Sequence, residues 1–287
     1  MHSIKKIGNI PNIVSDIPSL PVIASRILHI IADDTSSLEE LKKVISLDQS
    51  FSSRLLRIAN SPYYRRGRRI NDITDATMLI GFNTIKALVF AASLKDLCRI
   101  SDATDRLLWE HSMAVSIGAT VIANETALLA SGEPLIYGLL HDIGKVIISR
   151  SMRDKYAEVI TMVEEQKNSF MEAEQKILGF DHCSVGEYVA NLWNLPANLS
   201  FVIANHHRED LLETVQDAEL KKITLIVKAA DILCSELQTD LIDNVSLTED
   251  EWKFIKLASP KKRDSVIMKI NEEYPHYKDF VLGQSPS

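Results

Sequence analysis

The sequence predicts an all-α protein built as two helical lobes. Apolar residues recur at helical spacing through almost the whole chain, and no convincing run alternates apolar and polar residues as a half-buried strand would. Serine, threonine and aspartate precede several of the apolar segments, as helix caps do. Five of the eight histidines lie between residues 111 and 207, so the second half of the chain holds most of the chemically suggestive side chains.

The first predicted lobe, residues 10–105, contains about five helices and no cluster of side chains that suggests chemistry. Ser37 and Glu40 form a capping-box pattern before LEELKKVISL. The segment DATMLIGFNTIKALVFAASL predicts two helices that turn at Gly81, with Asn83 placed to cap the second. Such a turn also occurs in DNA-binding helix-turn-helix units, but it is common in any helical protein.

The second predicted lobe, residues 106–237, carries ionisable side chains on apolar helix faces. In LLWEHSMAVSIGATVIA, His111 shares its face with leucines, alanine, glycine and valine at spacings of three, four, seven and ten. His182 lines up in the same way with apolar residues of DHCSVGEYVANLW, where Asp181 is placed to cap the helix. Asp231 lies one turn from apolar residues of ELKKITLIVKAADILCSEL. A C-terminal extension, residues 238–287, follows, and Thr248 and Glu251 predict a capped helix in it.

The segment LLHDIGK, residues 139–145, places a histidine beside an aspartate in an apolar run, and FVIANHH ends on two adjacent histidines. A buried carboxylate without a partner costs several kcal/mol, so it must be paired, hydrogen-bonded or bound to a metal. Seven side chains are therefore predicted to converge on one polar pocket as metal ligands: His111, His141, Asp142, His182, His206, His207 and Asp231. Imidazoles and carboxylates without thiolate suit iron, manganese, zinc or magnesium, and seven groups exceed one tetrahedral zinc site. We expect one or two divalent ions.

A structural role is the alternative for each of these residues taken alone. A single histidine on an apolar face is more often a hydrogen-bonded core residue than a ligand, and Asp231 could pair with an arginine. The two adjacent histidines could form a solvated helix end. Seven such groups in about 120 residues are, however, hard to satisfy by unrelated local bonds.

Lys145 follows His141 by four residues and Asp142 by three, which predicts one shared helical face. Beside a metal, its ammonium would hold a phosphate oxygen as a point charge.

The composition limits the class of protein. The chain has 287 residues, is 46% hydrophobic and carries a net charge of −7, which argues against a surface that attracts nucleic acid or anionic membrane throughout. No apolar stretch has the length of a membrane span or of a signal-peptide core, so we expect a cytoplasmic location. Cys98, Cys183 and Cys234 lie far apart in the sequence and are interpreted as core thiols.

The segment NSPYYRRGRRIND supports a different hypothesis. It combines two tyrosines with four arginines, Tyr63, Tyr64, Arg65, Arg66, Arg68 and Arg69, a mixture that could stack bases and neutralise phosphates. The same loop could be a solvated surface or dock an acidic protein, so nucleic acid is the less favoured partner.

The order H, HD, H, HH, D resembles the ligand series of the HD-domain phosphohydrolases, and in particular that of the HD-GYP cyclic-di-GMP phosphodiesterases. Around these ligands, segments such as DIPSLPVIASRIL, LWEHSMAVSIG and YGLLHDIGKVII resemble the HDOD family, a divergent branch of that superfamily. The resemblance covers roughly residues 14–237, and we assign residues 10–237 to an HDOD domain. Two features depart from the HD-GYP pattern: Arg208 follows the histidine pair where those enzymes carry an acidic residue, and no GYP sequence follows before Asp231.

The resemblance implies two functions. The favoured one is a bacterial signal-transduction module that acts through contacts with a signalling protein or a small phosphorylated ligand, with the metal site structural or vestigial. The alternative is an active metal-dependent phosphohydrolase that cleaves a nucleotide or cyclic dinucleotide. In that case Asp142 would bridge two ions and Lys145 would steady the charge on the phosphoryl oxygens.

Overall fold

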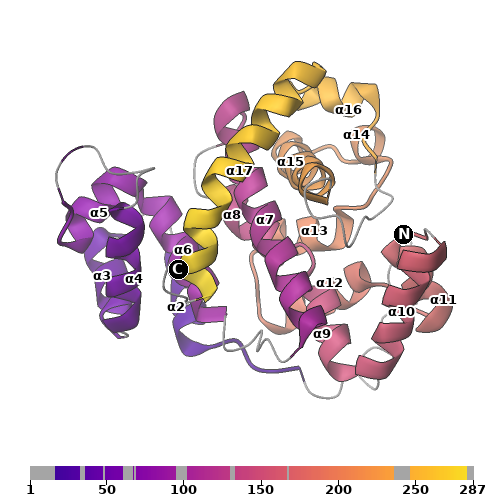
Figure 1. Ribbon diagram of the computed structural model, residues 1–287, viewed down its shortest axis with the longest axis horizontal. Helices are drawn as coiled ribbons and strands as arrows, with labels where there is room; N and C mark the ends of the chain where they lie inside the picture. Colours follow the sequence, from indigo (N-terminus) through magenta and orange to yellow (C-terminus); the bar gives the residue numbers. More distant parts are fainter. Residues whose placement is uncertain are drawn as a thin grey trace.

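The structure is a computed structural model that describes residues 17–32, 36–47, 49–60, 67, 69–94, 102–129, 133–166, 168–235 and 246–282. Every regular element in these ranges is a helix, and the helices form two lobes, so the predicted all-α, two-lobed fold is confirmed (Figure 1). The residue bounds assigned to the lobes and the extension remain predictions.

The first lobe contains α2 (Val22–Ala32), α3 (Leu38–Ile45), α4 (Gln49–Ala59), α5 (Ile73–Ile80) and α6 (Phe82–Leu94). The predicted capping box at Ser37 and Glu40 is present, with Ser37 Oγ accepting from the Glu40 amide at 3.3 Å. The helices α5 and α6 turn through 110° at Gly81, whose φ of 99° favours glycine. The predicted cap at Asn83 is wrong. The Gly81 carbonyl already accepts the first hydrogen bond of α6, so that helix begins at Phe82.

The second lobe is built around α7 (Ala103–Thr126), which packs against α8 (Glu133–Leu140) and α15 (Ala218–Ser235). The remaining helices of this lobe follow in order: α9 (Ile143–Ser151), α10 (Arg153–Gln166), α11 (Phe170–Ile177), α12 (His182–Leu192), α13 (Ala197–Asn205) and α14 (Leu211–Thr214). The predicted caps at Asp181 and at Thr248 with Glu251 are both present.

The C-terminal helices join the lobes. After α16 (Glu249–Phe254), α17 (Pro260–Leu282) runs along α7 and also contacts α4 and α6 (Figure 1). Among the described residues, no single helix combines the length and apolar character of a membrane span; the bent pair α5 and α6 does so only when both are counted together. From Thr84 to Leu94, α6 is buried in the protein.

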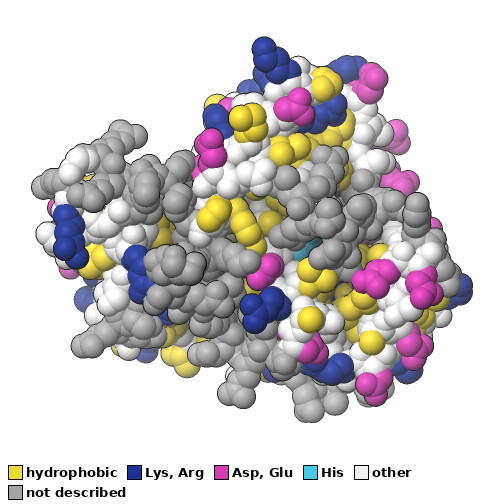
Figure 2. Space-filling view, in the orientation of Figure 1, with side chains coloured by type: hydrophobic (Ala, Val, Ile, Leu, Met, Phe, Trp, Pro, Cys, Tyr) yellow, Lys and Arg dark blue, Asp and Glu magenta, His cyan; other side chains and the backbone are white. Residues whose placement is uncertain are grey.

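Acidic and basic side chains both occur in scattered patches on the described part of the face in Figure 2. This mixture agrees with the modest net charge of −7. Of the arginines in the proposed nucleic-acid loop, Arg69 is described and exposed. Tyr63, Tyr64, Arg65, Arg66 and Arg68 lie outside the described residues.

Candidate metal centre

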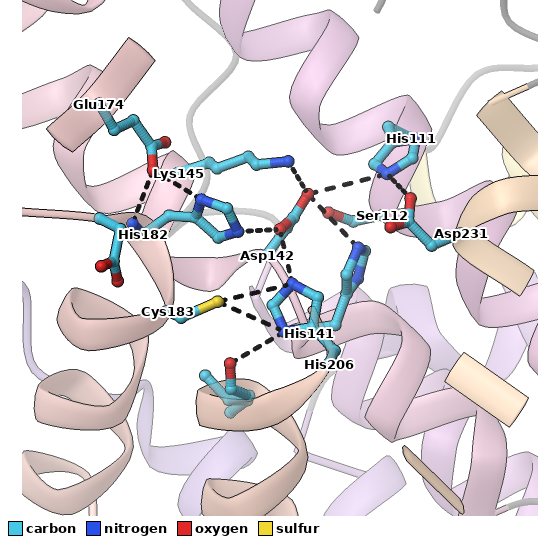
Figure 3. A network of polar contacts seen from close by, with 12 residues as sticks. His111, Ser112, His141, Asp142, Lys145, Glu174, His182, Cys183, His206 and Asp231 are labelled. Atoms are coloured by element: carbon cyan, nitrogen blue, oxygen red, sulfur yellow. Dashed lines mark hydrogen bonds and ion pairs between the residues drawn. The ribbon is translucent and has the colours of Figure 1, made fainter. Parts of the chain in front are cut away.

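Five helical segments of the second lobe bring ionisable side chains to one buried point (Figure 3). His111 comes from α7 and Asp231 from α15, while His141 and Asp142 form the turn between α8 and α9. His182 is the first residue of α12, and His206 follows the last residue of α13. The exposed fractions are 7% for His111, 2% for Asp142 and Asp231, 1% for His141 and 0% for His182 and His206. The structure therefore gathers six of the seven predicted ligands in the protein interior.

The Asp142 carboxylate lies at the centre of this group, and its two oxygens face different histidines. Oδ2 lies 3.3 Å from His141 Nε2 and 3.7 Å from His111 Nε2. Oδ1 lies 3.4 Å from His182 Nε2 and 3.4 Å from His206 Nε2. On the outer side of the group, His111 Nε2 also lies 3.1 Å from Asp231 Oδ1. The carboxylate of Asp142 thus stands between two sets of nitrogen donors.

Backbone carbonyls orient two of these rings. His141 Nδ1 lies 2.7 Å from the Gly138 carbonyl oxygen, and His206 Nδ1 lies 2.9 Å from the Ile203 carbonyl oxygen. A carbonyl can only accept, so each Nδ1 carries a hydrogen and donates it. In the neutral ring, Nε2 then presents its lone pair toward Asp142. A lone pair and a carboxylate oxygen repel each other unless a cation or a proton lies between them.

Glu174 of α11 orients the third ring. Its Oε2 accepts from the His182 backbone amide at 2.8 Å and lies 2.7 Å from His182 Nδ1. The carboxyl group is fully buried, and its Oε1 accepts from the Tyr156 hydroxyl at 3.4 Å. A carboxylate behind a histidine whose other nitrogen points into a polar centre is the usual outer partner of a metal-binding histidine.

The electrostatics of the centre favour ionised acids. Burial by itself would raise the pKa of Asp142, but the adjacent His141 and the Lys145 ammonium hold that pKa well below its usual range. Burial likewise opposes ionisation of Asp231, yet its hydrogen bond to His111 and the charge of that ring lower its pKa to about 2. Burial lowers the pKa of His141, which favours the neutral ring. Burial alone would also lower the pKa of His182, but the Glu174 carboxylate raises it well above its usual value.

Lys145 lies in the first turn of α9, where its Nζ is 2.8 Å from Asp142 Oδ2 and 4.3 Å from the centre of the Phe170 ring. The predicted approach of Lys145 to Asp142 is therefore present. The shared helical face with His141 is not, because His141 lies in the turn before the helix.

A second group of donors adjoins Asp142 Oδ1. His207, the seventh predicted ligand, is partly exposed, and its ring centre lies 4.1 Å from that of His206 and 5.0 Å from that of His182. The buried Cys183 follows His182 on α12, and its Sγ lies 3.9 Å from His206 Nδ1. One ligand atom from each of His182, Cys183, His206 and His207 lies within 4.8 Å of the others.

Two residues of the centre escaped the sequence-based prediction. Cys183 was interpreted as a core thiol, although its position next to His182 could have suggested a ligand. Glu174 gave a weaker signal: it shares a helical face with Phe170 and Ile177, which places a carboxylate among apolar positions.

The donor set fits a divalent cation. His141 Nε2, His182 Nε2 and Asp142 Oδ1 are buried and have no hydrogen-bond partner. Two more groups of potential ligands lie within 4.8 Å, one of His111, His141 and Asp231 and one of His141, Asp142 and His206. Nitrogen and oxygen donors in this proportion suit zinc, iron or manganese. The three groups overlap, because His141 and His206 each belong to two of them.

These features define an α-helical protein with a buried centre of histidines and aspartates. A model of the HDOD domain matches residues 17–209, and the chain belongs to the HDOD family. The expected family is thus confirmed.

Solved structures support this assignment. An HDOD domain protein of Geobacter sulfurreducens, 25% identical, has a TM-score of 0.76 and is matched over 96% of both chains. A candidate signal transduction protein of Marinobacter aquaeolei, 17% identical, has a TM-score of 0.74 over 95% of this chain and 60% of that one. A candidate metal-dependent phosphohydrolase of Shewanella amazonensis, 18% identical, has a TM-score of 0.64 over 95% and 98%. At 17% and 18% identity, the Marinobacter and Shewanella proteins show that the fold is shared.

Curated relatives are longer than this chain. An uncharacterized protein of Treponema pallidum is 25% identical over 207 residues, which are 71% of this chain and 40% of that protein. A Bacillus subtilis protein matches at the same identity over 35% of its own length.

Proposed function

We propose that the chain is a regulatory HDOD module whose second lobe holds one or two divalent ions, and that it acts through contacts with a signalling protein or a small phosphorylated ligand. The observation that carries this proposal is the position of Asp142, whose two buried oxygens each face two histidine nitrogens at 3.3–3.7 Å. A cation between Asp142 and these rings would satisfy the lone pairs of His141 and His206 together with the carboxylate oxygens.

Burial of the donors favours a structural or regulatory role for the ions. The side chains whose nitrogens lie within 3.7 Å of Asp142 are at most 7% exposed, and only a small area of histidine surface shows near the middle of the face in Figure 2. An ion held in this way fixes α7, α12, α13 and α15 relative to one another. The likeness in fold to a candidate signal transduction protein supports the same interpretation.

Metal analysis tests the first part of the proposal. We expect the purified full chain, after incubation with zinc or manganese and removal of excess ion, to retain at least one equivalent by mass spectrometry. Asp142→Asn should remove most of it, whereas Asp264→Asn, a change at an exposed aspartate of α17, should not. Retention of less than stoichiometric metal by the folded wild-type chain under all these conditions would refute the proposed centre.

Phosphohydrolysis is the second candidate, and one specific contact favours it. The Lys145 ammonium lies 2.8 Å from Asp142 Oδ2, so a positive charge is already held at the centre. Bound divalent ions would act as Lewis acids and lower the pKa of a bound water molecule, so that hydroxide would be available at neutral pH. Within the chain, Asp142, the histidines and Asp231 would hold the ions, and Lys145 would neutralise an anionic substrate.

An assay separates the two functions. The metal-loaded chain is incubated with a generic phosphodiester and with a cyclic dinucleotide in the presence of Mn²⁺. Turnover that is lost in Lys145→Met, with the metal content unchanged, would establish hydrolysis. A full metal complement without turnover on either substrate would favour the regulatory module.

The side chain of Arg208, which departs from the HD-GYP pattern, is directed toward its own loop. Its guanidinium pairs with Asp210 and donates to Asn205 Oδ1 at 3.3 Å. Arg208 therefore stabilises the loop after the histidine pair, and we expect substrate selection to differ from that of the HD-GYP enzymes.

A further inference from the structure

Two pairs of potential metal ligands face each other where the start of α12 lies beside the end of α13. His182 and Cys183 open α12, and His206 and His207 follow the end of α13. The Cys183 Sγ lies 3.9 Å and 4.0 Å from the two ring nitrogens of His206, and each of the four residues offers a ligand atom within 4.8 Å of the other three. Figure 3 shows the sulfur directed toward the side of Asp142 on which His182 and His206 lie.

A buried nitrogen without a partner points into the same space. His182 is fully buried, and its Nε2 has no hydrogen-bond partner, while its Nδ1 is held by Glu174 at 2.7 Å. The orientation that Glu174 enforces leaves Nε2 available beside Cys183 and 3.4 Å from Asp142 Oδ1. The thiol therefore does not stand alone: it adjoins an oriented imidazole that needs a cation or a proton.

We propose that Cys183 is a metal ligand, and that with His182, His206 and His207 it makes the second ion position selective for a thiophilic divalent ion, zinc foremost. This inference rests on the proposed metal centre. Thiolate with imidazole is a donor set that zinc prefers, whereas magnesium and manganese prefer oxygen. The position that adjoins Asp231, with His111 and His141, has nitrogen and oxygen donors only, so the two positions differ in the ions that they select.

Burial raises the pKa of the Cys183 thiol, so in the absence of an ion the sulfur keeps its proton. When an ion binds, the S–H bond breaks, the sulfur forms its bond to the metal as thiolate, and the proton leaves to solvent. Cys183 thus becomes a thiolate ligand only when the ion binds.

Cobalt substitution tests the inference on the full chain. Cobalt(II) replaces zinc in such sites, and a thiolate ligand gives an intense near-ultraviolet charge-transfer band that imidazole and carboxylate ligands do not give. We expect the wild-type chain loaded with cobalt to show this band. Cys183→Ser should lose it, while Cys234→Ser, a change at a buried thiol of α15 outside the group, should keep it.

Competition between ions provides the second measurement. We expect Cys183→Ser to lower the preference for zinc over manganese at least about 10-fold, because a direct ligand should matter no less than its outer partners do. Stoichiometric cobalt in the wild-type chain without the thiolate band would overturn the role of Cys183 and leave the metal centre intact. The absence of bound cobalt would overturn both. Because the band is measured on the wild-type chain, the test stands even if Cys183→Ser does not fold.

Discussion

Replacement of Gly144 by alanine should separate the two helices on which the centre depends. Gly144 is the glycine of LLHDIGK and lies at the start of α9, against the first turn of α12. A Cβ atom at this position would overlap the His182 carbonyl oxygen, and it would lie 2.8 Å from the carbonyl carbon of that residue and 2.9 Å from the Gly186 amide nitrogen. Ordinary carbon contacts are about 3.5–4.0 Å, so α9 and α12 must move apart by about 1 Å. All of these neighbours are backbone atoms, which cannot rotate away.

The magnitude follows from this contact. Overpacking costs about 1–3 kcal/mol, and a backbone clash lies at the upper end of that range. Alanine restores about 1 kcal/mol of helix propensity, so we expect a net loss of about 2 kcal/mol. The movement also lengthens the 3.4 Å separation between Asp142 and His182. Metal ligands tolerate errors of only about 0.2 Å, so the second ion should be lost.

Urea unfolding followed by circular dichroism measures the loss of stability, and mass spectrometry measures the bound zinc. Gly118→Ala is the matched control, because it also adds a methyl group to a helix of the same lobe. There the Cβ meets side chains, with Cys234 Sγ at 2.9 Å and Ala230 Cβ at 3.2 Å. We expect a smaller loss of stability and an unchanged metal content. If Gly144→Ala matched the wild-type chain in both measurements, the close approach of α9 and α12 would not govern the centre.

Three further outcomes are expected. Glu174→Gln should weaken zinc binding by about 10- to 100-fold, measured by competition with a chelator, because the His182 ring loses the carboxylate that orients it. Zinc affinity should rise with pH in the same assay, since the raised pKa of His182 means that a proton competes with the ion below that pKa; a flat profile would contradict this. Lys228→Met should destabilise the chain by about 3 kcal/mol in urea unfolding, because it strands the buried Glu251 carboxylate 3.6 Å away. Adding Glu251→Gln to Lys228→Met should recover part of the loss, and no recovery would assign it to packing instead.

Local rules predicted the helices and the burial of several candidate ligands, because each depends on residues close in the sequence. The face of His111 follows from the spacing of its own helix, and the cap at Asp181 from the residues that it precedes. The burial of His182 and Asp231 is consistent with the same reasoning. The predicted cap at Asn83 was wrong because Gly81 follows the end of α5 and also accepts the first hydrogen bond of α6, so Asn83 already lies inside the helix.

The contributions of Glu174 and Cys183 depend on how successive helices are placed relative to one another, which periodicity cannot show. Glu174 is eight residues from His182, and only the path of the chain between α11 and the start of α12 brings its carboxylate behind the ring. The proximity of Cys183 to His206 likewise depends on how α12 meets the end of α13. Residue spacing predicts which helical face such a residue lies on, but only the tertiary fold shows which side chain it contacts.

The charge balance of the centre connects the number of ions with the function. The centre contains three buried carboxylates, those of Asp142, Asp231 and Glu174, and one buried ammonium, that of Lys145, which leaves two negative charges when the imidazoles are neutral. One divalent ion neutralises these two negative charges. A centre without net charge does not attract an anion. A second ion reverses the sign, even when a Cys183 thiolate adds one negative charge, and a positive buried centre favours a phosphate group. The singly loaded chain is therefore suited to a structural role and the doubly loaded chain to a phosphorylated ligand, so occupancy of the second position would decide between the two proposed functions.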